Sequence, residues 1–364
     1  MNISNKNMTF IDFFAGIGGF TAGLTQAGMK CVGYCENDKF ALKSYTAMHS
    51  PKNKECRKEW FCDDITKARA DEIPYADGWT AGFPCQDISV CGSQHGISGA
   101  RSGLFFEIIR LLKGKSDKGK PQWLVFENVR NLVSVKEGED FTTVLREISE
   151  AGYDCEWQII NSKLFVPQNR ERVFIIGHFR GASPREVFPV TGTSSQAACE
   201  PGELIEIIGG SQGNRVYCSQ GISTCLVSTA GGFASKTGAY CVGSNPCFSK
   251  PPANEQSQLY RGSCLAFIDL CVGNPKITNI ARCIKARYDS GISNRCELSG
   301  VLANGRIRRL TPRECFRLQG FSDEMFDKAA AVNSDTQLYR QAGNSVTVPV
   351  IRAIGERLMS AYES

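Results

Sequence analysis

The sequence has no long apolar run and lacks an apolar stretch at its beginning. No segment approaches the ~18 uninterrupted apolar residues that span a membrane, so no membrane association is expected. The first eleven residues lack the apolar core of a secretory signal peptide, and a cytoplasmic location is therefore expected. With 364 residues, of which 42% are apolar and 22% charged, the chain has a globular composition and room for about two domains.

Histidine is also scarce, and paired cysteines are missing. The chain holds 17 cysteines but only three histidines and no C-x-x-C pair. Without a signal peptide, reduced thiols are expected rather than disulfides. Structural zinc sites usually draw on closely spaced cysteine and histidine pairs, so no metal is predicted. Most of the cysteines are interpreted as small core residues.

The chain divides into regions of different texture. Residues 1–180 alternate apolar runs with helical spacing, which is typical of a doubly wound α/β domain. From 181 to about 310, Gly, Ser, Thr and Asn dominate and short β-branched runs predict a smaller β-rich domain. Strands are predicted at 10–14, 30–35, 79–82, 123–127, 155–161 and 172–178, and helices at 20–27, at 104–112, from a capping box at Thr311, Pro312 and Glu314, and at 345–362.

The first motif that could carry chemistry is Asp12-Phe-Phe-Ala-Gly16-Ile-Gly18-Gly19, followed by Glu36. A strand that enters a glycine turn lets the backbone approach a cofactor, and an acidic residue about 20 positions later can hold ribose hydroxyls. The alternative is an ordinary strand-to-helix turn. The spacing differs from G-x-G-x-x-G and disfavours a dehydrogenase.

The second motif, Gly82-Phe-Pro84-Cys85-Gln86, places a cysteine after a predicted strand. Ligands of α/β sheets bind at the carboxyl ends of strands, so Cys85 is a candidate nucleophile. The alternative is a buried thiol. The glycine- and serine-rich stretch 89–103 is interpreted as a loop that closes over a substrate.

Two further motifs are weaker when each is taken alone. Glu127 ends a predicted strand and could be a capping or solvated residue, and Arg170 and Arg172 precede a strand and could be surface charge. Together, however, six segments occur in order, beginning at Asp12, Gly82, Glu127, Gln168, Arg309 and Gln341. This series closely resembles the DNA (cytosine-5) methyltransferase family of bacterial or phage type.

The resemblance implies a fold and a domain plan. The fold is an α/β, Rossmann-like S-adenosyl-L-methionine-dependent methyltransferase domain with an inserted, smaller β-rich target-recognition domain. The catalytic and cofactor-binding domain would comprise 1–180 and 341–364, and the recognition domain 181–305. Residues 306–340 would form the hinge and helix that link the two.

The resemblance also implies the reaction. The Cys85 thiolate would attack C6 of cytosine, Glu127 would protonate or hydrogen-bond N3 and the exocyclic amine, and Arg172 would bond O2. C5 would then accept the methyl group, and loss of the C5 proton with release of Cys85 would give 5-methylcytosine. Arg170, Pro84 and Gln86 lie in the same motifs and complete the candidate catalytic set.

S-adenosyl-L-methionine is the implied cofactor. Phe14, Ala15, Gly16, Gly18 and Gly19 would line it, Glu36 would hold the ribose, and Asp64 and Ile65 would contact adenine. Asn37 stands where the family often has a stacking aromatic residue, so adenine stacking would be weaker or come from elsewhere. The candidate set is completed by Pro84, Leu104, Asn344, Ser345 and Val346, of which the last three belong to a motif that the family folds beside the first.

Double-stranded DNA is the implied partner, with the target cytosine flipped out of the helix. The net charge of +5 lies entirely in residues 181–312, which hold 13 Lys and Arg and 8 Asp and Glu. Such a basic segment would neutralise phosphates. The candidate DNA-binding residues are Ser89, Arg101, Arg282, Arg287, Arg306 and Arg309.

Other hypotheses stay open from the sequence. A tRNA cytosine-5 methyltransferase shares these motifs, although a recognition segment of more than 100 residues favours duplex DNA. A non-catalytic DNA-binding regulator is disfavoured because Cys85, Glu127 and Arg172 are all present. A monomer is expected, and a restriction endonuclease encoded nearby is a candidate partner. The target sequence cannot be read from these residues.

Overall fold

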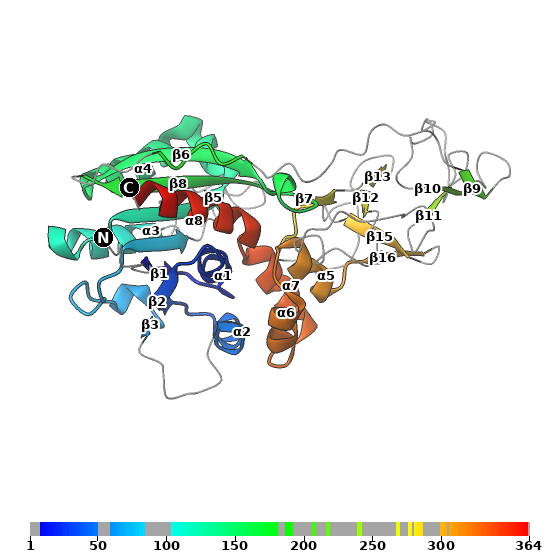
Figure 1. The fold of residues 1–364 in the computed structure, drawn as a ribbon, viewed down its shortest axis with the longest axis horizontal. Coiled ribbons are helices and arrows are strands. Elements are labelled where there is room, and N and C mark those ends of the chain that lie inside the picture. Colours follow the sequence, from blue (N-terminus) through cyan, green and yellow to red (C-terminus); the bar gives the residue numbers. More distant parts are fainter. Residues whose placement is uncertain are drawn as a thin grey trace, which may run out of the picture.

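A seven-stranded sheet forms the centre of the computed structural model (Figure 1). The structure describes residues 8–49, 59–83, 103–180, 186–191, 206–208, 216–218, 239–241, 267–269, 276–278, 280–286, 299–303 and 306–362. The strand order is β3-β2-β1-β4-β5-β8-β6. The strands are β1 (Thr9–Phe13), β2 (Lys30–Cys35), β3 (Trp60–Cys62), β4 (Gly78–Gly82), β5 (Trp123–Val129), β6 (Tyr153–Asn161) and β8 (Glu171–Phe179).

The direction of the strands sets the position of the site. Strands β1 to β5 are parallel, whereas β8 runs antiparallel to both of its neighbours, β5 and β6. The beginning of β8 therefore lies at the edge where β5 ends, and Val129 pairs with Arg172. The order reverses between β1 and β4, which is where open α/β sheets bind their ligands.

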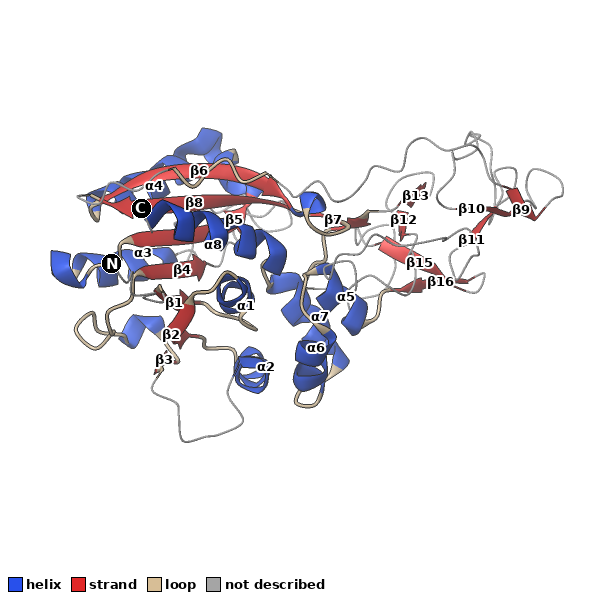
Figure 2. Ribbon diagram, in the orientation of Figure 1, coloured by secondary structure: helices blue, strands red, loops and turns tan. Residues whose placement is uncertain are grey.

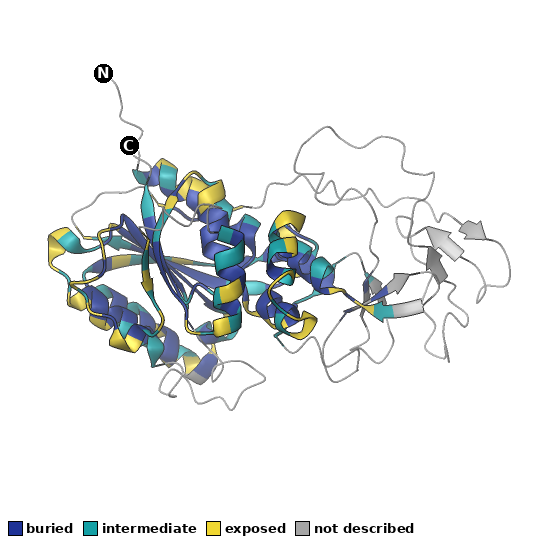
Figure 3. Ribbon diagram, turned by 90° about the horizontal axis from the view of Figure 1, so that it is seen from below, coloured by how far each residue is buried: buried dark blue, intermediate teal, exposed yellow. Residues whose placement is uncertain are grey.

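Helices cover both faces of this sheet (Figure 2). The helices α3 (Leu104–Lys113) and α4 (Glu139–Glu150) share one core with Leu124 and Phe126, whereas α1 (Gly19–Gln26) and α8 (Val348–Tyr362) share another with Trp123 and Val125. Successive side chains of a strand point to opposite faces, so β5 contributes to both cores. Six of the seven residues of β5 are buried, and Figure 3 shows the buried strands of the sheet in the layer between the helices.

A third core joins the last helices to shorter strands. Its apolar residues come from α5 (Pro312–Leu318), α6 (Asp323–Ala330) and α7 (Asp335–Asn344), together with Phe267, Ala281, Ile284 and Val301. Ile17 and Met48, the latter in α2 (Lys39–His49), join the same core. Apolar residues from 267 to 342 are thereby packed against Ile17 of the glycine turn, whereas the domain boundaries at 181, 305 and 340 stay a prediction.

Eight short strands make up most of the described residues between 206 and 309. They are β9 (Glu206–Ile208), β10 (Val216–Cys218), β11 (Ala239–Cys241), β12 (Phe267–Asp269), β13 (Lys276–Thr278), β14 (Ala281–Arg282), β15 (Ser299–Ala303) and β16 (Arg306–Arg309). Strand β14 pairs with β7 (Gln168–Asn169), so this region contacts the segment between β6 and β8 of the seven-stranded sheet. Across the described part of the chain, no helix has both the length and the apolar character of a membrane span.

The predicted strands and helices are present, one of them with a different start. Helices α2, α4, α6 and α7 lie where no helix was predicted. All six predicted strands are present, as is the capping box at Thr311. Strand β3 was not predicted, because three residues are too few to show an alternating pattern. The predicted helix 345–362 is wrong at its start: α7 ends at Asn344, Ser345 is extended, and α8 begins at Val348. Pro349 then falls in the first turn, where its missing N–H costs nothing.

Candidate active site

The glycine turn after β1 is built from left-handed backbone and close contacts. Phe14, Gly16 and Gly18 have φ values of 54°, 57° and 81°. A Cβ on Gly18 would collide with the ring of His49, whose Nε2 lies 3.0 Å from the carbonyl of Ile17. A Cβ on Gly16, in contrast, would meet no atom within 4 Å. The turn is thus closely packed at Gly18, whereas the space beside Gly16 is open.

The last sequence motif lies directly beside the first. A Cβ on Gly19 would come within 2.6 Å of Val346 Cγ2 and 2.7 Å of Ser345 Oγ. Only glycine allows α1 to begin this close to the segment between α7 and α8. The expected folding of Ser345 and Val346 against the glycine turn is therefore confirmed, and Asn344 is exposed at the end of α7.

Glu36, directly after β2, holds this turn in place through a hydrogen bond to its backbone. Its two carboxylate oxygens accept hydrogen bonds from the backbone N–H groups of Gly16 and Asp38, each at 2.7 Å. Burial raises the pKa of Glu36, and these hydrogen bonds oppose the shift. Each oxygen keeps a second lone pair, so the carboxylate can still accept from a ligand.

Asp12, Thr21 and Thr80 form a buried polar cluster next to the glycine turn. Asp12 is 0% exposed; its Oδ2 accepts from the Thr21 hydroxyl at 2.8 Å and its Oδ1 accepts from the Thr80 hydroxyl at 3.1 Å. Burial raises the pKa of Asp12 to about 7, although the hydrogen bonds from Thr21 and Thr80 lower it. This cluster links β1 to α1 and to β4.

The other candidate cofactor residues lie along the same edge. Asp64 follows β3; its Oδ1 accepts from the Thr66 N–H and hydroxyl, which lowers its pKa. Ile65 is buried, Leu104 is partly buried at the start of α3, and Asn37 is exposed after β2. Their contact with a cofactor stays a prediction.

Glu127 and Arg172 form an ion pair where β5 ends and β8 begins. Arg172 Nε lies 3.0 Å from Glu127 Oε1, and the exposed fractions of the two side chains are 18% and 11%. Arg172 also donates from Nη1 to the Glu171 carbonyl at 2.8 Å. Held this way, the Arg172 guanidinium offers hydrogen-bond donors and the Glu127 carboxylate offers acceptors. Both side chains can therefore bind the same polar ring of a ligand.

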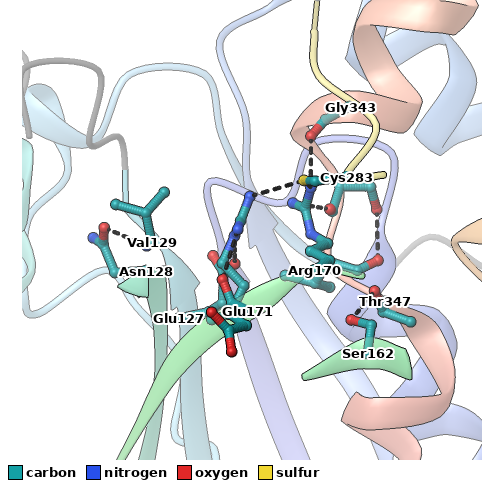
Figure 4. A network of polar contacts seen from close by, with 12 residues as sticks. Glu127, Asn128, Val129, Ser162, Arg170, Glu171, Cys283, Gly343 and Thr347 are labelled. Carbon is teal, nitrogen blue, oxygen red and sulfur yellow. Dashed lines mark hydrogen bonds and ion pairs between the residues drawn. The ribbon is translucent and has the colours of Figure 1, made fainter. Parts of the chain in front are cut away.

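This pair lies next to the strand that leads to Cys85. Gly82, the last residue of β4, pairs in register with Glu127, and Asn128 donates from Nδ2 to the Phe83 carbonyl at 3.4 Å. Asn128 and Glu127 are labelled in Figure 4. Pro84, Cys85, Gln86, Ser89, Arg101 and Arg287 lie outside the described residues, so their predicted roles stay predictions.

Arg170 has different surroundings from those of Arg172. It is 3% exposed and donates from Nη1 to the carbonyls of Ile284 and Gly343, both at 3.3 Å, and from Nη2 to the Ser345 carbonyl at 2.7 Å (Figure 4). Burial lowers its pKa. The guanidinium therefore joins three chain segments, and these contacts favour a structural role over the predicted catalytic one.

Three candidate DNA-binding residues are placed by the structure. Arg309 is exposed and stacks on the ring of Tyr339 at 5.0 Å, Arg282 is partly buried in β14, and Arg306 begins β16. Their contact with DNA stays a prediction. Sequence reasoning missed His49 behind Gly18 and Cys283 between the two arginines, because neither residue stands in a motif.

The comparisons with known proteins identify the class. The family model for C-5 cytosine-specific DNA methylases matches residues 8–360, and the chain belongs to this family. It is similar to the type II methyltransferase M.DsaV of Dactylococcopsis salina, with 32% identity over 98% of this chain and 88% of the relative. M.NlaX of Neisseria lactamica is 30% identical over 97% of each chain. The protein is a DNA (cytosine-5) methyltransferase.

Solved structures support the fold. The Entamoeba histolytica methyltransferase EhMeth aligns with a TM-score of 0.60 and 17% identity, covering 98% of each chain. The Schizosaccharomyces pombe Dnmt2 methyltransferase aligns with a TM-score of 0.58 and 18% identity, covering 97% of this chain and 99% of that one. The predicted α/β, Rossmann-like fold with a β-rich addition is confirmed.

Proposed function

We propose that this methyltransferase uses S-adenosyl-L-methionine to methylate C5 of a cytosine flipped out of double-stranded DNA, through a covalent bond between Cys85 and C6. The observation that carries the proposal is the Glu127–Arg172 ion pair, which lies beside the end of the strand leading to Cys85. The six sequence segments that carry the resemblance are all present in the chain, and the glycine turn and Glu127 lie at the carboxyl ends of β1 and β5.

The glycine turn fits the cofactor. The open side of Gly16 leaves room for a ligand where any side chain would project, and the Glu36 carboxylate has free lone pairs beside it. Glu36 would hold the ribose hydroxyls, Phe14 to Gly19 the methionine portion, and Asp64 and Ile65 the adenine. S-adenosyl-L-methionine, when bound, supplies an electrophilic methyl group carried on a sulfonium.

The chain's own residues would activate the base. C5 of cytosine is a weak nucleophile, so the thiolate of Cys85 adds to C6 and makes C5 electron-rich. Glu127 would give a proton to N3 and accept a hydrogen bond from the exocyclic amine, and thereby offset the negative charge that builds up on the ring. Arg172 would donate to O2. After methylation, C5 loses its proton to solvent, the C5–C6 double bond re-forms, and the C6–S bond breaks to release the Cys85 thiolate.

We further propose that residues 181–305 read the DNA. This assignment is supported by the excess of positive charge in 181–312, since phosphate neutralisation favours binding. The relatives include both type II and orphan methyltransferases, so the comparisons assign no endonuclease partner to this chain.

The test uses purified full-length protein, radiolabelled S-adenosyl-L-methionine, and duplex plasmid DNA or tRNA as substrate. We expect label in DNA only, and bisulfite sequencing should locate 5-methylcytosine at one recurring sequence. Label in tRNA without label in DNA would instead establish the RNA alternative.

Two variants test the assigned roles. Cys85→Ser should bind S-adenosyl-L-methionine in calorimetry but transfer no methyl group. Glu127→Gln should slow single-turnover transfer by roughly 10²- to 10⁴-fold, as expected for loss of a general acid. Glu171→Gln is the matched control, because that exposed carboxylate pairs with Arg130 and not with Arg172. Full turnover by Cys85→Ser would refute the covalent step.

A further inference from the structure

Cys283 lies between the two arginines of the site. It follows β14, and its Sγ is 3.3 Å from Arg170 Nη1 (Figure 4). The same Sγ lies 3.9 Å from Arg172 Nη2. One sulfur atom thus contacts a guanidinium that holds the junction together and a second guanidinium that pairs with Glu127.

If Cys283 were a neutral thiol, the positive charges around its sulfur atom would outnumber the negative ones. Arg170 is 3% exposed, and among the residues that the structure describes no carboxylate lies within ion-pair distance of it. Its other acceptors are the neutral carbonyls of Ile284, Gly343 and Ser345. Glu127 supplies a single negative charge for two neighbouring cations. A buried charge that lacks an opposite charge is strongly destabilising.

A thiolate at Cys283 supplies the missing charge. Burial by itself would raise the pKa of this thiol, but the positive charges and N–H donors of Arg170 and Arg172 lower it below its ordinary value. The proton lost from sulfur goes to solvent, and no other bond changes.

We propose that Cys283 is a positioning residue for methyl transfer: its thiolate pairs with both Arg170 and Arg172 and so holds Arg172 against Glu127. This inference rests on the proposed function, because it assigns Arg172 and Glu127 to the target base. Neighbouring contacts fix the thiolate in turn, since Ala281 pairs with Gln168 and the Ile284 N–H donates to Gln168 Oε1 at 3.0 Å.

Two substitutions separate charge from packing. Cys283→Ser keeps the size but removes the charge, whereas Cys283→Asp keeps the charge in a different shape. If the charge positions Arg172, single-turnover methylation should fall on the order of 10- to 100-fold in Cys283→Ser, and Cys283→Asp should keep most of the wild-type rate. If the thiol merely packs, Cys283→Asp should methylate more slowly than Cys283→Ser. That result, or an equal loss of rate in both variants, would overturn the proposal.

A spectroscopic titration tests the thiolate without relying on activity. The absorbance difference at 240 nm between wild type and Cys283→Ser should titrate with a midpoint below the ordinary value of about 8.5. Cys155→Ser is the matched control, because burial raises the pKa of Cys155 to about 12 and the difference should stay flat. A midpoint above 8.5 for Cys283 would refute the thiolate even if Cys283→Asp failed to fold.

The two proposals fail in different ways. If wild-type protein transfers no methyl group to cytosine, the proposed function fails whatever the titration shows. If wild type is active and the Cys283 difference spectrum shows no thiolate, only the positioning role fails.

Discussion

Replacing Asp12 with asparagine should make the protein's stability less dependent on pH. Asp12 is fully buried, and burial raises its pKa to about 7. Asparagine imitates the protonated acid: its oxygen can accept from the Thr21 N–H and hydroxyl, and its amide can donate to the Thr80 hydroxyl. That hydroxyl can in turn donate to the Ile11 carbonyl, 3.4 Å away.

The direction in which stability changes with pH follows from how many protons the folded and unfolded states bind. The unfolded chain releases the Asp12 proton near pH 4, whereas the folded protein keeps it until about pH 7. The folded state binds the extra proton in between, so this contribution to stability is present below pH 4 and is lost as the pH rises through 7. With about 1.4 kcal/mol per pKa unit, the wild type should lose roughly 2 to 3 kcal/mol from this group between pH 5 and 8.

Urea unfolding at pH 5, 6, 7 and 8 measures this difference. The free energy of unfolding of Asp12→Asn minus that of wild type should rise by roughly 2 to 3 kcal/mol across the series. Asp323→Asn is the control, because Arg317 lowers the pKa of Asp323 and the corresponding difference should stay constant above pH 5. A constant difference for Asp12→Asn as well would show that Asp12 is already ionised at pH 5.

Two further predictions concern close packing and the buried cation. Gly19→Ala should cost about 1 to 3 kcal/mol in urea unfolding and weaken S-adenosyl-L-methionine binding, because the added Cβ would overlap Val346 and Ser345; unchanged stability and affinity would contradict the packing. Arg170→Met should cost more than about 3 kcal/mol, since three buried carbonyls lose their donor, and Arg170→Lys should restore little of it. Normal stability with lost single-turnover activity would instead return Arg170 to the catalytic set.

Local patterns predict the central sheet better than its short additions. The run from Lys30 to Cys35 becomes β2 with the same bounds, and the continuous apolar run from Trp123 to Phe126 lies buried in β5, as is typical of a buried strand. Strand β3 has three residues and pairs only with β2 at the edge of the sheet, so its sequence carries no period. The break between α7 and α8 depends on packing of Ser345 and Val346 against Gly19, which no local pattern encodes.

The residues of the site also differ in how well the sequence predicts them. Spacing makes the glycine turn and Glu36 candidates for a cofactor site, with an ordinary strand-to-helix turn as the alternative, because both halves of that motif lie within one β-α-β unit. Arg172 is identified only through the family resemblance, since a basic residue before a strand is usually surface charge. What brings it to Glu127 is the antiparallel direction of β8, which depends on tertiary pairing. Cys283 lies more than 100 residues from both arginines, and nothing in the sequence singles it out among 17 cysteines.

The order of the strands explains why the two halves of the proposed reaction can meet. The glycine turn and Glu36 follow β1 and β2, on one side of the point where the order reverses, and the Glu127–Arg172 pair lies across β5 and β8 on the other. Strand β4 lies between them and leads to Cys85. The Thr80 hydroxyl of β4 donates to Asp12 of β1 at 3.1 Å, directly across that point. Since ligands of open α/β sheets bind where the order reverses, a cofactor held by β1 and β2 and a base held by β5 and β8 would face each other over β4.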